Sequence, residues 1–233
     1  MVPNAAAVGR HPHLADARRP DSVRVDLHSH TMWSGDSTTT PEELEEAVLA
    51  SGLDVLCITD HNSIRGATEL ADRLPCRVVV GEELRTHAGE IIGLFLTEHV
   101  PFGVSPREAA QRIRDQGGLV YVPHPFDPMR RNLAEAALVD LVDAGLVDAI
   151  EVLNAKTSLG HLNDRAAAFA ADRSLAAGAG SDAHVPDALG AAYVEMPDFA
   201  DAPSFLASLR QGTVVGHHFD AARPWRARIV PST

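Results

Sequence analysis

Residues 26–30 of the chain read Asp26-Leu27-His28-Ser29-His30. They close the first β-strand that the sequence predicts, Arg24–His28. Alternate side chains of an extended strand point to the same side, so His28 and His30 present two imidazoles to one place. Two such imidazoles are typical ligands of a divalent metal ion. A single His-x-His pair is equally compatible with structural or surface histidines, so the interpretation depends on the rest of the chain.

The same arrangement recurs along the chain, because short apolar runs end in a histidine, an aspartate or a glutamate. The further clusters are Thr59-Asp60-His61, Gly81-Glu82-Glu83, Pro123-His124-Pro125 and Gly180-Ser181-Asp182-Ala183-His184. Adjacent carboxylates after a buried run are costly unless they are solvated, paired or bound to metal. In β/α barrels the carboxyl ends of the strands open on one face, where active sites form. We therefore expect these polar side chains to converge.

Short β-rich runs alternate with helical stretches from residue 22 onward. The predicted strands are Arg24–His28, Asp54–Thr59, Arg77–Val80, Ile91–Leu96, Leu119–Val122, Ala149–Leu153, Ala176–Gly180 and Thr213–Gly216. Helices are expected after the capping residues Thr40 and Ser105, and over Ile64–Arg73, Asn132–Ala144, His161–Asp172 and Ala202–Arg210. This alternation predicts βα units around a parallel sheet, in one α/β domain over residues 22–233. Residues 1–21 lack periodicity, so we expect a mobile leader there.

Composition narrows the classes of partner. The chain has 233 residues and a net charge of −12, which argues against binding duplex nucleic acid, because neutralising its phosphates needs clustered Lys and Arg. Cys57 and Cys76 lie in or beside apolar runs and form no Cys-x-x-Cys motif, so reduced, buried thiols are expected. No apolar run is long enough to cross a membrane, and a cytoplasmic location is expected. The oligomeric state is left open.

The five motifs, taken in order, resemble those of the PHP (polymerase and histidinol phosphatase) domain family. The resemblance rests on residues 26–37, Thr59–Asn62, Gly81–Glu83, Pro123–Pro125 and Gly180–His184, and it spans roughly Val23 to Met196. It implies a distorted, TIM-like (β/α)7 barrel that holds two or three divalent ions, Mn, Fe or Zn. It also implies the metal ligands His28, His30, Asp36, His61, Glu83, His124, Asp182 and His184.

The resemblance also assigns neighbouring residues. Glu83 matches the glutamate that bridges metals, so Glu82 is expected to point away from the site. Asp26 and Asp60 are expected to orient ligand imidazoles by accepting their distal N–H. Many relatives read His-Leu-Leu-Gly after the bridging glutamate, whereas this chain has Glu90 where that histidine is common. Glu90 is thus a candidate oxygen ligand for a third, harder ion, with solvent exposure as the alternative.

The remaining histidines match no motif. His87 lies near Glu90 and is expected to be an exposed loop residue, although it could substitute as a ligand. Surface or locally bonded roles are expected for His11, His13, His99, His161, His217 and His218.

The expected reaction is hydrolysis of a phosphate ester by a hydroxide that bridges the ions, with a small phosphorylated molecule as substrate. Arg65, Arg130 and Arg131 follow motif residues and are candidates to bind phosphate oxygens, with a surface role as the alternative. Two other functions stay open: an exonuclease or 3′,5′-bisphosphate phosphatase that acts on short oligonucleotides, and a non-catalytic metal-binding module. Only Asn62 to Glu82 separates the second motif from the bridging glutamate, which leaves no room for a helical insertion over the site.

Overall fold

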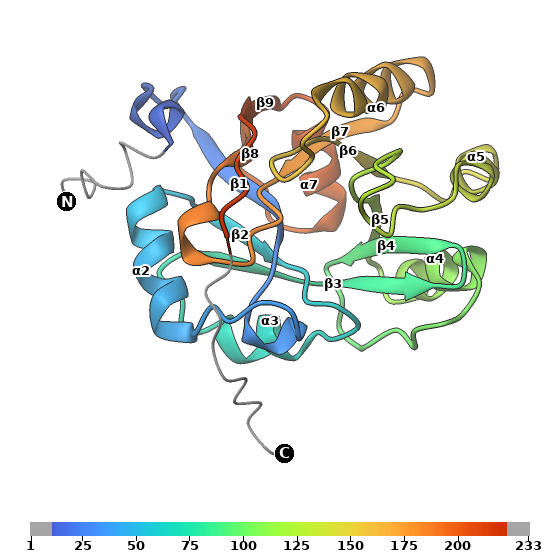
Figure 1. Cartoon of the computed structure of the whole chain (residues 1–233), viewed down its shortest axis with the longest axis horizontal. Helices are drawn as coiled ribbons and strands as arrows, with labels where there is room; N and C mark the ends of the chain where they lie inside the picture. Colours follow the sequence, from blue (N-terminus) through green and yellow to red (C-terminus); the bar gives the residue numbers. More distant parts are fainter. Residues whose placement is uncertain (1–10, 223–233) are drawn as a thin grey trace.

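Nine strands form one continuous sheet in the computed structural model, which describes residues 11–222 (Figure 1). The strands are β1 (Ser22–Ser29), β2 (Val55–Ile58), β3 (Arg77–Thr86), β4 (Gly89–Leu94), β5 (Leu119–Val122), β6 (Ala149–Asn154), β7 (Ala176–Gly180), β8 (Ala192–Pro197) and β9 (Thr213–Gly216). Their order across the sheet is β7-β6-β5-β4-β3-β2-β1-β8-β9.

The sheet curls into a nearly closed barrel, because residues after β7 meet the end of β1. A parallel bridge joins Ser29 to Ala183. His30 N donates to Ala183 O at 3.0 Å, and Asp182 N donates to His28 O at 2.8 Å. Strands β1 to β7 therefore encircle the barrel, and β8 with β9 extends the sheet from the amino-terminal half of β1. The expected distorted α/β barrel is confirmed.

Two strands differ from the expectation. β4 covers Gly89–Leu94 instead of Ile91–Leu96 and runs antiparallel to both β3 and β5, so the sheet is mixed and not wholly parallel. The cause is a tight hairpin between Thr86 and Gly89, which returns the chain without a helical crossover. β8 was not predicted, and it pairs antiparallel with β1.

Most of the helices lie around the outside of the strands, whereas α7 (Ala202–Leu209) is seen in the middle of the ring of strands (Figure 1). The other helices are α2 (Pro41–Ser51), α3 (Arg65–Leu70), α4 (Pro106–Asp115), α5 (Glu135–Asp143) and α6 (Gly160–Asp172), with short 3-10 turns η1 (Pro12–Ala15), η2 (Met32–Ser34) and η3 (Pro186–Ala188). The two predicted caps are confirmed: Thr40 forms a capping box with Glu43, and Ser105 accepts a hydrogen bond from Glu108 N. None of the helices within residues 11–222 is long and apolar enough to cross a membrane.

Apolar packing holds the strands in place. One core cluster draws on β1 to β8 and on α7, whose Phe205 packs edge-to-face against Phe199 at 4.8 Å between ring centroids. A second cluster joins β4, β5 and β6 to α4, α5 and α6, and a third joins β2 to α2, α3 and η3. Close packing in these clusters holds the strands in place, and this positions the side chains at the barrel mouth.

The expected leader, residues 1–21, is packed against the barrel in its described part. The Arg18 guanidinium binds both carboxylate oxygens of Asp54 at 2.7 Å, and Arg19 Nε donates to Glu195 Oε1 at 2.9 Å. His11 is buried, and its Nε2 donates to Asp187 O at 2.8 Å. Residues 1–10 lie outside the described part of the chain.

Candidate metal centre

The polar residues that end the strands gather at one mouth of the barrel. His28 is the penultimate residue of β1, Glu83 lies within β3 and Glu90 within β4. The other candidate ligands lie in the segments that follow β1, β2, β5 and β7. An open cavity of about 580 Å³ is lined by Asp36, His61, Glu83, Glu90, His124, Asp182 and His184, among others. His28 and His30 lie beneath it and are buried. The predicted convergence of side chains is therefore present.

Three overlapping groups of side chains have the spacing of metal ligands. In each group, one potential ligand atom per residue lies within 4.8 Å of the others. The groups are His30, Asp36, His61 and His184; His28, Glu83 and His124; and His28, His30 and Asp182. Because the groups share His28 and His30, ions held by them would lie close together.

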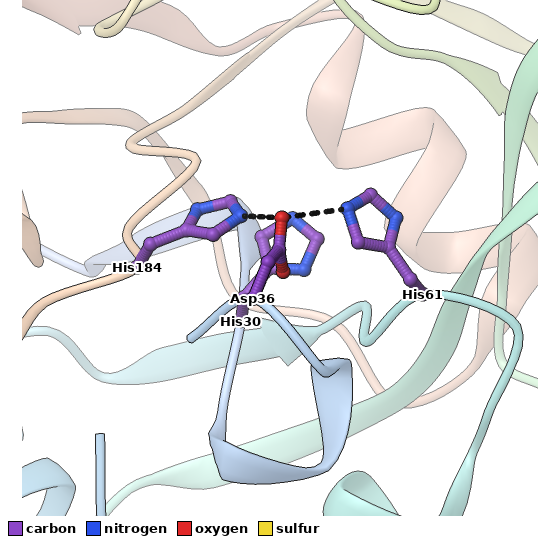
Figure 2. Close-up of side chains that lie close together, drawn as sticks. All are labelled: His30, Asp36, His61 and His184. Carbon is purple, nitrogen blue, oxygen red and sulfur yellow. Dashed lines mark hydrogen bonds and ion pairs between the residues drawn. The ribbon is translucent and has the colours of Figure 1, made fainter. Parts of the chain in front are cut away.

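The first group is the most open of the three. Figure 2 shows Asp36 between the rings of His184 and His61, with His30 beside them. Asp36 Oδ2 lies 3.1 Å from His184 Nε2 and 3.5 Å from His61 Nε2. Burial raises the pKa of Asp36, but the two imidazoles more than offset this and hold it well below its usual range. Asp36 is therefore an anion ready to coordinate a cation.

Glu83, a member of the second group, contacts histidines of all three groups. Its Oε2 lies 3.4 Å from His28 Nε2, 3.3 Å from His30 Nε2 and 3.0 Å from His61 Nδ1, while its Oε1 lies 2.8 Å from His124 Nε2. One carboxylate facing four imidazoles from two sides has the arrangement of a ligand that bridges metals. Asp182 Oδ1 lies 3.5 Å from His30 Nε2, which brings a second carboxylate to the same place.

The imidazoles lie in direct contact with one another. His28 Nε2 lies 3.1 Å from His30 Nε2, and the ring centroids of His30 and His184 are 4.2 Å apart. Burial lowers the pKa of His30 to about 4, and the nearby His184 adds to the effect. Burial would also lower the pKa of His61, but Glu83 and Asp36 raise it to about 10. Nitrogen and oxygen donors at these distances fit divalent cations bound between them.

The backbone is strained at the same place. His124 has φ of 28°, Asp182 has φ of 49° and Asn62 has φ of 53°, although none is glycine. Left-handed conformations of such residues cluster at functional sites, where the surrounding structure holds them. The proline on each side of His124 restricts its backbone further.

The expected roles of Asp26 and Asp60 need correction. Asp26 Oδ1 accepts hydrogen bonds from the backbone N of His28 and Ser181, and Asp60 accepts from the backbone N and the hydroxyl of Thr31. Neither accepts an imidazole N–H within residues 11–222. Burial raises the pKa of Asp26 to about 7 and that of Asp60 to about 6. Both brace the loops that carry the ligands instead of orienting rings.

Two other residues, which the sequence analysis did not single out, lie within hydrogen-bond distance of ligand imidazoles. His28 Nδ1 lies 3.2 Å from Glu151 Oε1, and His30 Nδ1 lies 2.8 Å from Ser34 Oγ. Glu151 sits inside the apolar strand β6, with no histidine beside it in the sequence. The cost of burying a lone carboxylate in such a strand was the available signal, the same one that drew attention to Glu82 and Glu83.

The arginines divide between site and surface. Arg130 lines the cavity, and its guanidinium donates to Asp182 Oδ2. Arg85 and Arg131 also line the cavity. Arg65 lies at the start of α3, and its Nε is 3.9 Å from Glu69 Oε1, a solvent-exposed pair away from the cavity. The structure brings Arg130 to the site and leaves Arg65 outside it.

The residues of the β3–β4 hairpin are also placed. Glu82 faces away from the cavity, as expected, and its Oε2 accepts from His99 Nδ1 at 2.7 Å. Glu90 is buried and lines the cavity, so it does not point to solvent. His87 is exposed in the turn.

Comparison with known proteins identifies the family. Residues 26–116 match the model of the PHP domain, and residues 160–214 match that of the PHP-associated region. Uncharacterized protein MJ1587 of Methanocaldococcus jannaschii is 39% identical over 155 residues, which are 61% of this chain and 88% of that protein. Uncharacterized protein MJ0417 of the same organism is 36% identical over 197 residues, 81% of this chain and 79% of that protein. The chain belongs to the PHP domain family.

Solved structures agree on the fold. A two-domain protein from Bacteroides vulgatus that contains a predicted PHP-like metal-dependent phosphoesterase superposes with a TM-score of 0.65 at 20% identity, over 87% of this chain and 70% of that one. PsfC from Pseudomonas syringae gives 0.64 at 21% identity, over 84% and 92%. The error-prone DNA polymerase of Mycobacterium tuberculosis is 41% identical over 88 residues, but these are only 8% of the polymerase. The likeness thus concerns the PHP fold.

Proposed function

We propose that the chain is a metal-dependent phosphoesterase that hydrolyses a small phosphate monoester. The observation that carries the proposal is the set of three overlapping ligand groups at one open cavity. In this proposal, the residues that hold two or three divalent ions are His28, His30, Asp36, His61, Glu83, His124, Asp182 and His184. Divalent ions bound there supply Lewis acidity toward phosphoryl oxygens and lower the pKa of a water molecule.

The donor set bears on the choice of metal. Five imidazoles and three carboxylates suit Mn or Fe as well as Zn, because carboxylate oxygens favour the harder ions. The protein residues around the ions have separate tasks. Arg130 lines the cavity, and its guanidinium would bind a phosphoryl oxygen there through a charge-assisted hydrogen bond. Arg85 and Arg131 add positive charge to the cavity wall.

The cavity lining supports a small substrate. Among the described residues that line it, none is Phe, Tyr or Trp. Proteins that bind single-stranded nucleic acid use such rings to stack bases. The lining therefore favours a small phosphorylated molecule over an oligonucleotide.

The adjacent carboxylates of β3 provide a matched test. Glu83→Gln should lower metal affinity and phosphatase activity by at least about a hundredfold. Replacing a residue that orients a metal ligand costs up to about a hundredfold in affinity, and replacing the ligand itself should cost more. Glu82→Gln should leave metal affinity and activity unchanged, because Glu82 faces His99 on the other side of the strand. Metal content is measured by elemental analysis. Activity is measured on phosphomonoesters, bisphosphates and short oligonucleotides after reconstitution with Mn, Fe or Zn.

The outcomes separate the candidate functions. Turnover of phosphomonoesters that is lost in Glu83→Gln and kept in Glu82→Gln supports the proposal. Preferred turnover of oligonucleotides or bisphosphates would favour a nuclease or bisphosphatase. Tight metal binding with no turnover of any ester would indicate a metal-binding module. Less than one ion per chain after reconstitution would contradict the metal centre itself.

A further inference from the structure

Glu151 is a fully buried carboxylate in the middle of β6. Its neighbours Ile150 and Val152 pack in the outer core cluster, so the alternation of the strand turns Glu151 toward the inside of the barrel. There it lies directly behind the candidate ligands. A carboxyl group so far from solvent requires polar partners, and three lie within hydrogen-bond distance.

The first partner is His28. Glu151 Oε1 lies 3.2 Å from His28 Nδ1, and a carboxylate can only accept a hydrogen bond. This contact therefore places the proton of the neutral imidazole on Nδ1. The lone pair is then on Nε2, the nitrogen that faces His30 Nε2 at 3.1 Å and Glu83 Oε2 at 3.4 Å. Glu151 thus turns the coordinating nitrogen of His28 toward the centre.

The second and third partners tie other ligands to the same carboxylate. Glu151 Oε2 accepts from the backbone N of His124 at 2.6 Å, which fixes the residue in its left-handed conformation. It also accepts from Asn154 Nδ2 at 2.9 Å, and that amide lies 3.2 Å from Asp182 Oδ2. One side chain from β6 is therefore connected to a candidate ligand in β1 and to candidate ligands that follow β5 and β7.

Gly180 shows how closely this arrangement is packed. A Cβ atom at Gly180 would lie 2.4 Å from His28 Cβ and 2.8 Å from Glu151 Oε1. Any larger residue would push the carboxylate and the imidazole apart. The space between β1, β6 and β7 is shaped for the contact between Glu151 and His28.

We infer that Glu151 is a positioning residue that sets the tautomer of His28 and holds the His124 backbone, so that both can ligate the ions of the proposed metal centre. The inference rests on the proposed function. It differs from the expectation for Asp26 and Asp60, because the orienting carboxylate comes from a strand that carries none of the sequence motifs. Glu151 makes no contact with substrate in this role.

The test uses the full-length protein and two readouts. The first is the affinity for Mn²⁺ and Zn²⁺, measured by titration into metal-free Glu151→Gln. We expect a loss of about 10–100-fold, the usual effect of removing a group that orients a ligand histidine. The matched control is Glu195→Gln, which removes another buried carboxylate, on β8, that pairs with Arg19 and Arg24. Its metal affinity should equal that of the wild type.

The second readout is the tautomer of His28 in the metal-free protein, observed by ¹⁵N NMR of labelled histidine. Burial would lower the pKa of His28, but Asp182, Glu151 and Glu83 hold it well above its ordinary value, so the spectra are recorded at alkaline pH, where the imidazole is neutral. The wild type should show an Nδ1–H imidazole at His28, and Glu151→Gln should lose that preference because a glutamine amide can donate to Nδ1. Glu151→Asp keeps the charge but shortens the reach, so it should show an intermediate affinity, and it replaces the glutamine variant if that one fails to fold.

The two readouts separate the inference from the proposed function. An unchanged His28 tautomer in the variants overturns the inference, even if the protein binds metal and hydrolyses phosphate esters. Equal losses of affinity in Glu151→Gln and Glu195→Gln also overturn it, because the effect would then be one of general stability. A wild-type protein that binds no metal but shows the tautomer change would refute the proposed function and leave the orienting contact supported.

Discussion

The carboxylate of Glu90 lies at the edge of the ligand cluster. Its Oε1 is 3.9 Å from His61 Nδ1 and 3.8 Å from Arg85 Nε, and it accepts no hydrogen bond from residues 11–222. Burial raises the pKa of Glu90 to about 7, and the negative charge of Glu83 adds to the effect. Glu90 thus lines the site with a polar atom that lacks a close partner, next to the three ligand groups and outside them.

Replacing Glu90 by histidine should change the metal preference of this edge. An imidazole is a better ligand for Zn²⁺ than a single carboxylate, so Glu90→His should bind about one more Zn²⁺ per chain, or bind its weakest Zn²⁺ more tightly. Glu90→Gln is the control, because it keeps the shape and removes the charge. The measurement is elemental analysis together with Zn²⁺ titration. Identical stoichiometry and affinity in the wild type and Glu90→His would show that residue 90 takes no part in metal binding.

The direction in which a single side chain points was predictable from the sequence where a motif shows on which side of a strand the residue lies. The two-residue period of β3 separates Glu83, which faces the imidazoles, from Glu82, which faces His99. Glu151 was not found because it stands alone in an apolar strand, and its partners are 123 and 27 residues away in the sequence. A motif read along the chain does not reveal contacts between strands.

The β3–β4 hairpin is the element that brings Glu90 to the cavity. Arg85 pairs with Glu90 across the hairpin, and Thr86 pairs with Gly89. Gly89 has φ of 124°, and a Cβ atom there would lie 2.3 Å from Asn132 O. Glycine is therefore required both by the conformation of the turn and by the close approach of the loop before α5.

Gly89→Ala should destabilise the protein and displace Glu90. The backbone strain alone costs about 1–3 kcal/mol, and the contact with Asn132 O adds to it. Gly103→Ala is the matched control, because Gly103 also has a positive φ, 78°, but no atom lies within 4 Å of its added Cβ among the described residues. Its cost should be about 1–2 kcal/mol. Chemical unfolding of both variants measures the difference, and equal free energies of unfolding would contradict the role assigned to the Asn132 contact.

Whole elements were predictable where local signals determine them. The helices that begin after Thr40 and Ser105 start where the caps and prolines indicate, and β9 covers the predicted residues Thr213–Gly216. β4 was predicted at Ile91–Leu96 and in a parallel sheet, and β8 was not predicted. β4 pairs antiparallel with β3 and β5, and β8 pairs antiparallel with β1 and β9. Such pairing depends on the neighbouring strands and not on the composition of the strand itself.

On the scale of the molecule, three histidines join the two ends of the described chain. His217 Nε2 lies 3.4 Å from His11 Nδ1, and His217 Nδ1 lies 3.2 Å from His13 Nδ1. His13 Nε2 in turn donates to Gly190 O at 2.9 Å. The residues are about 200 positions apart, so no sequence pattern could have shown the cluster. Through this cluster, the segment predicted as a mobile leader is joined to the residue that follows β9 and to the loop between β7 and β8.

This cluster should make the stability of the protein depend on pH. Burial lowers the pKa of His13 and of His217, so each binds its proton less readily in the folded than in the unfolded state. The stability that His13 and His217 contribute is fully present above the ordinary histidine pKa of about 6.5. It is lost as the pH falls from that value toward the lower pKa values of these histidines in the folded state. We therefore expect a smaller loss of unfolding free energy on acidification in a His13→Gln, His217→Gln double variant than in the wild type.

The measurement is urea unfolding of both proteins at about pH 7.5 and about pH 5.5, on either side of that ordinary pKa. All other ionisable groups are common to both proteins, so their response to pH cancels in the difference. His161→Gln, which changes an exposed histidine on α6, should lose as much stability as the wild type. If the double variant loses as much as His161→Gln, the cluster does not couple protonation to folding. If it loses less, protonation of these histidines weakens the attachment of residues 11–21 to β9 and to the loop that follows His184.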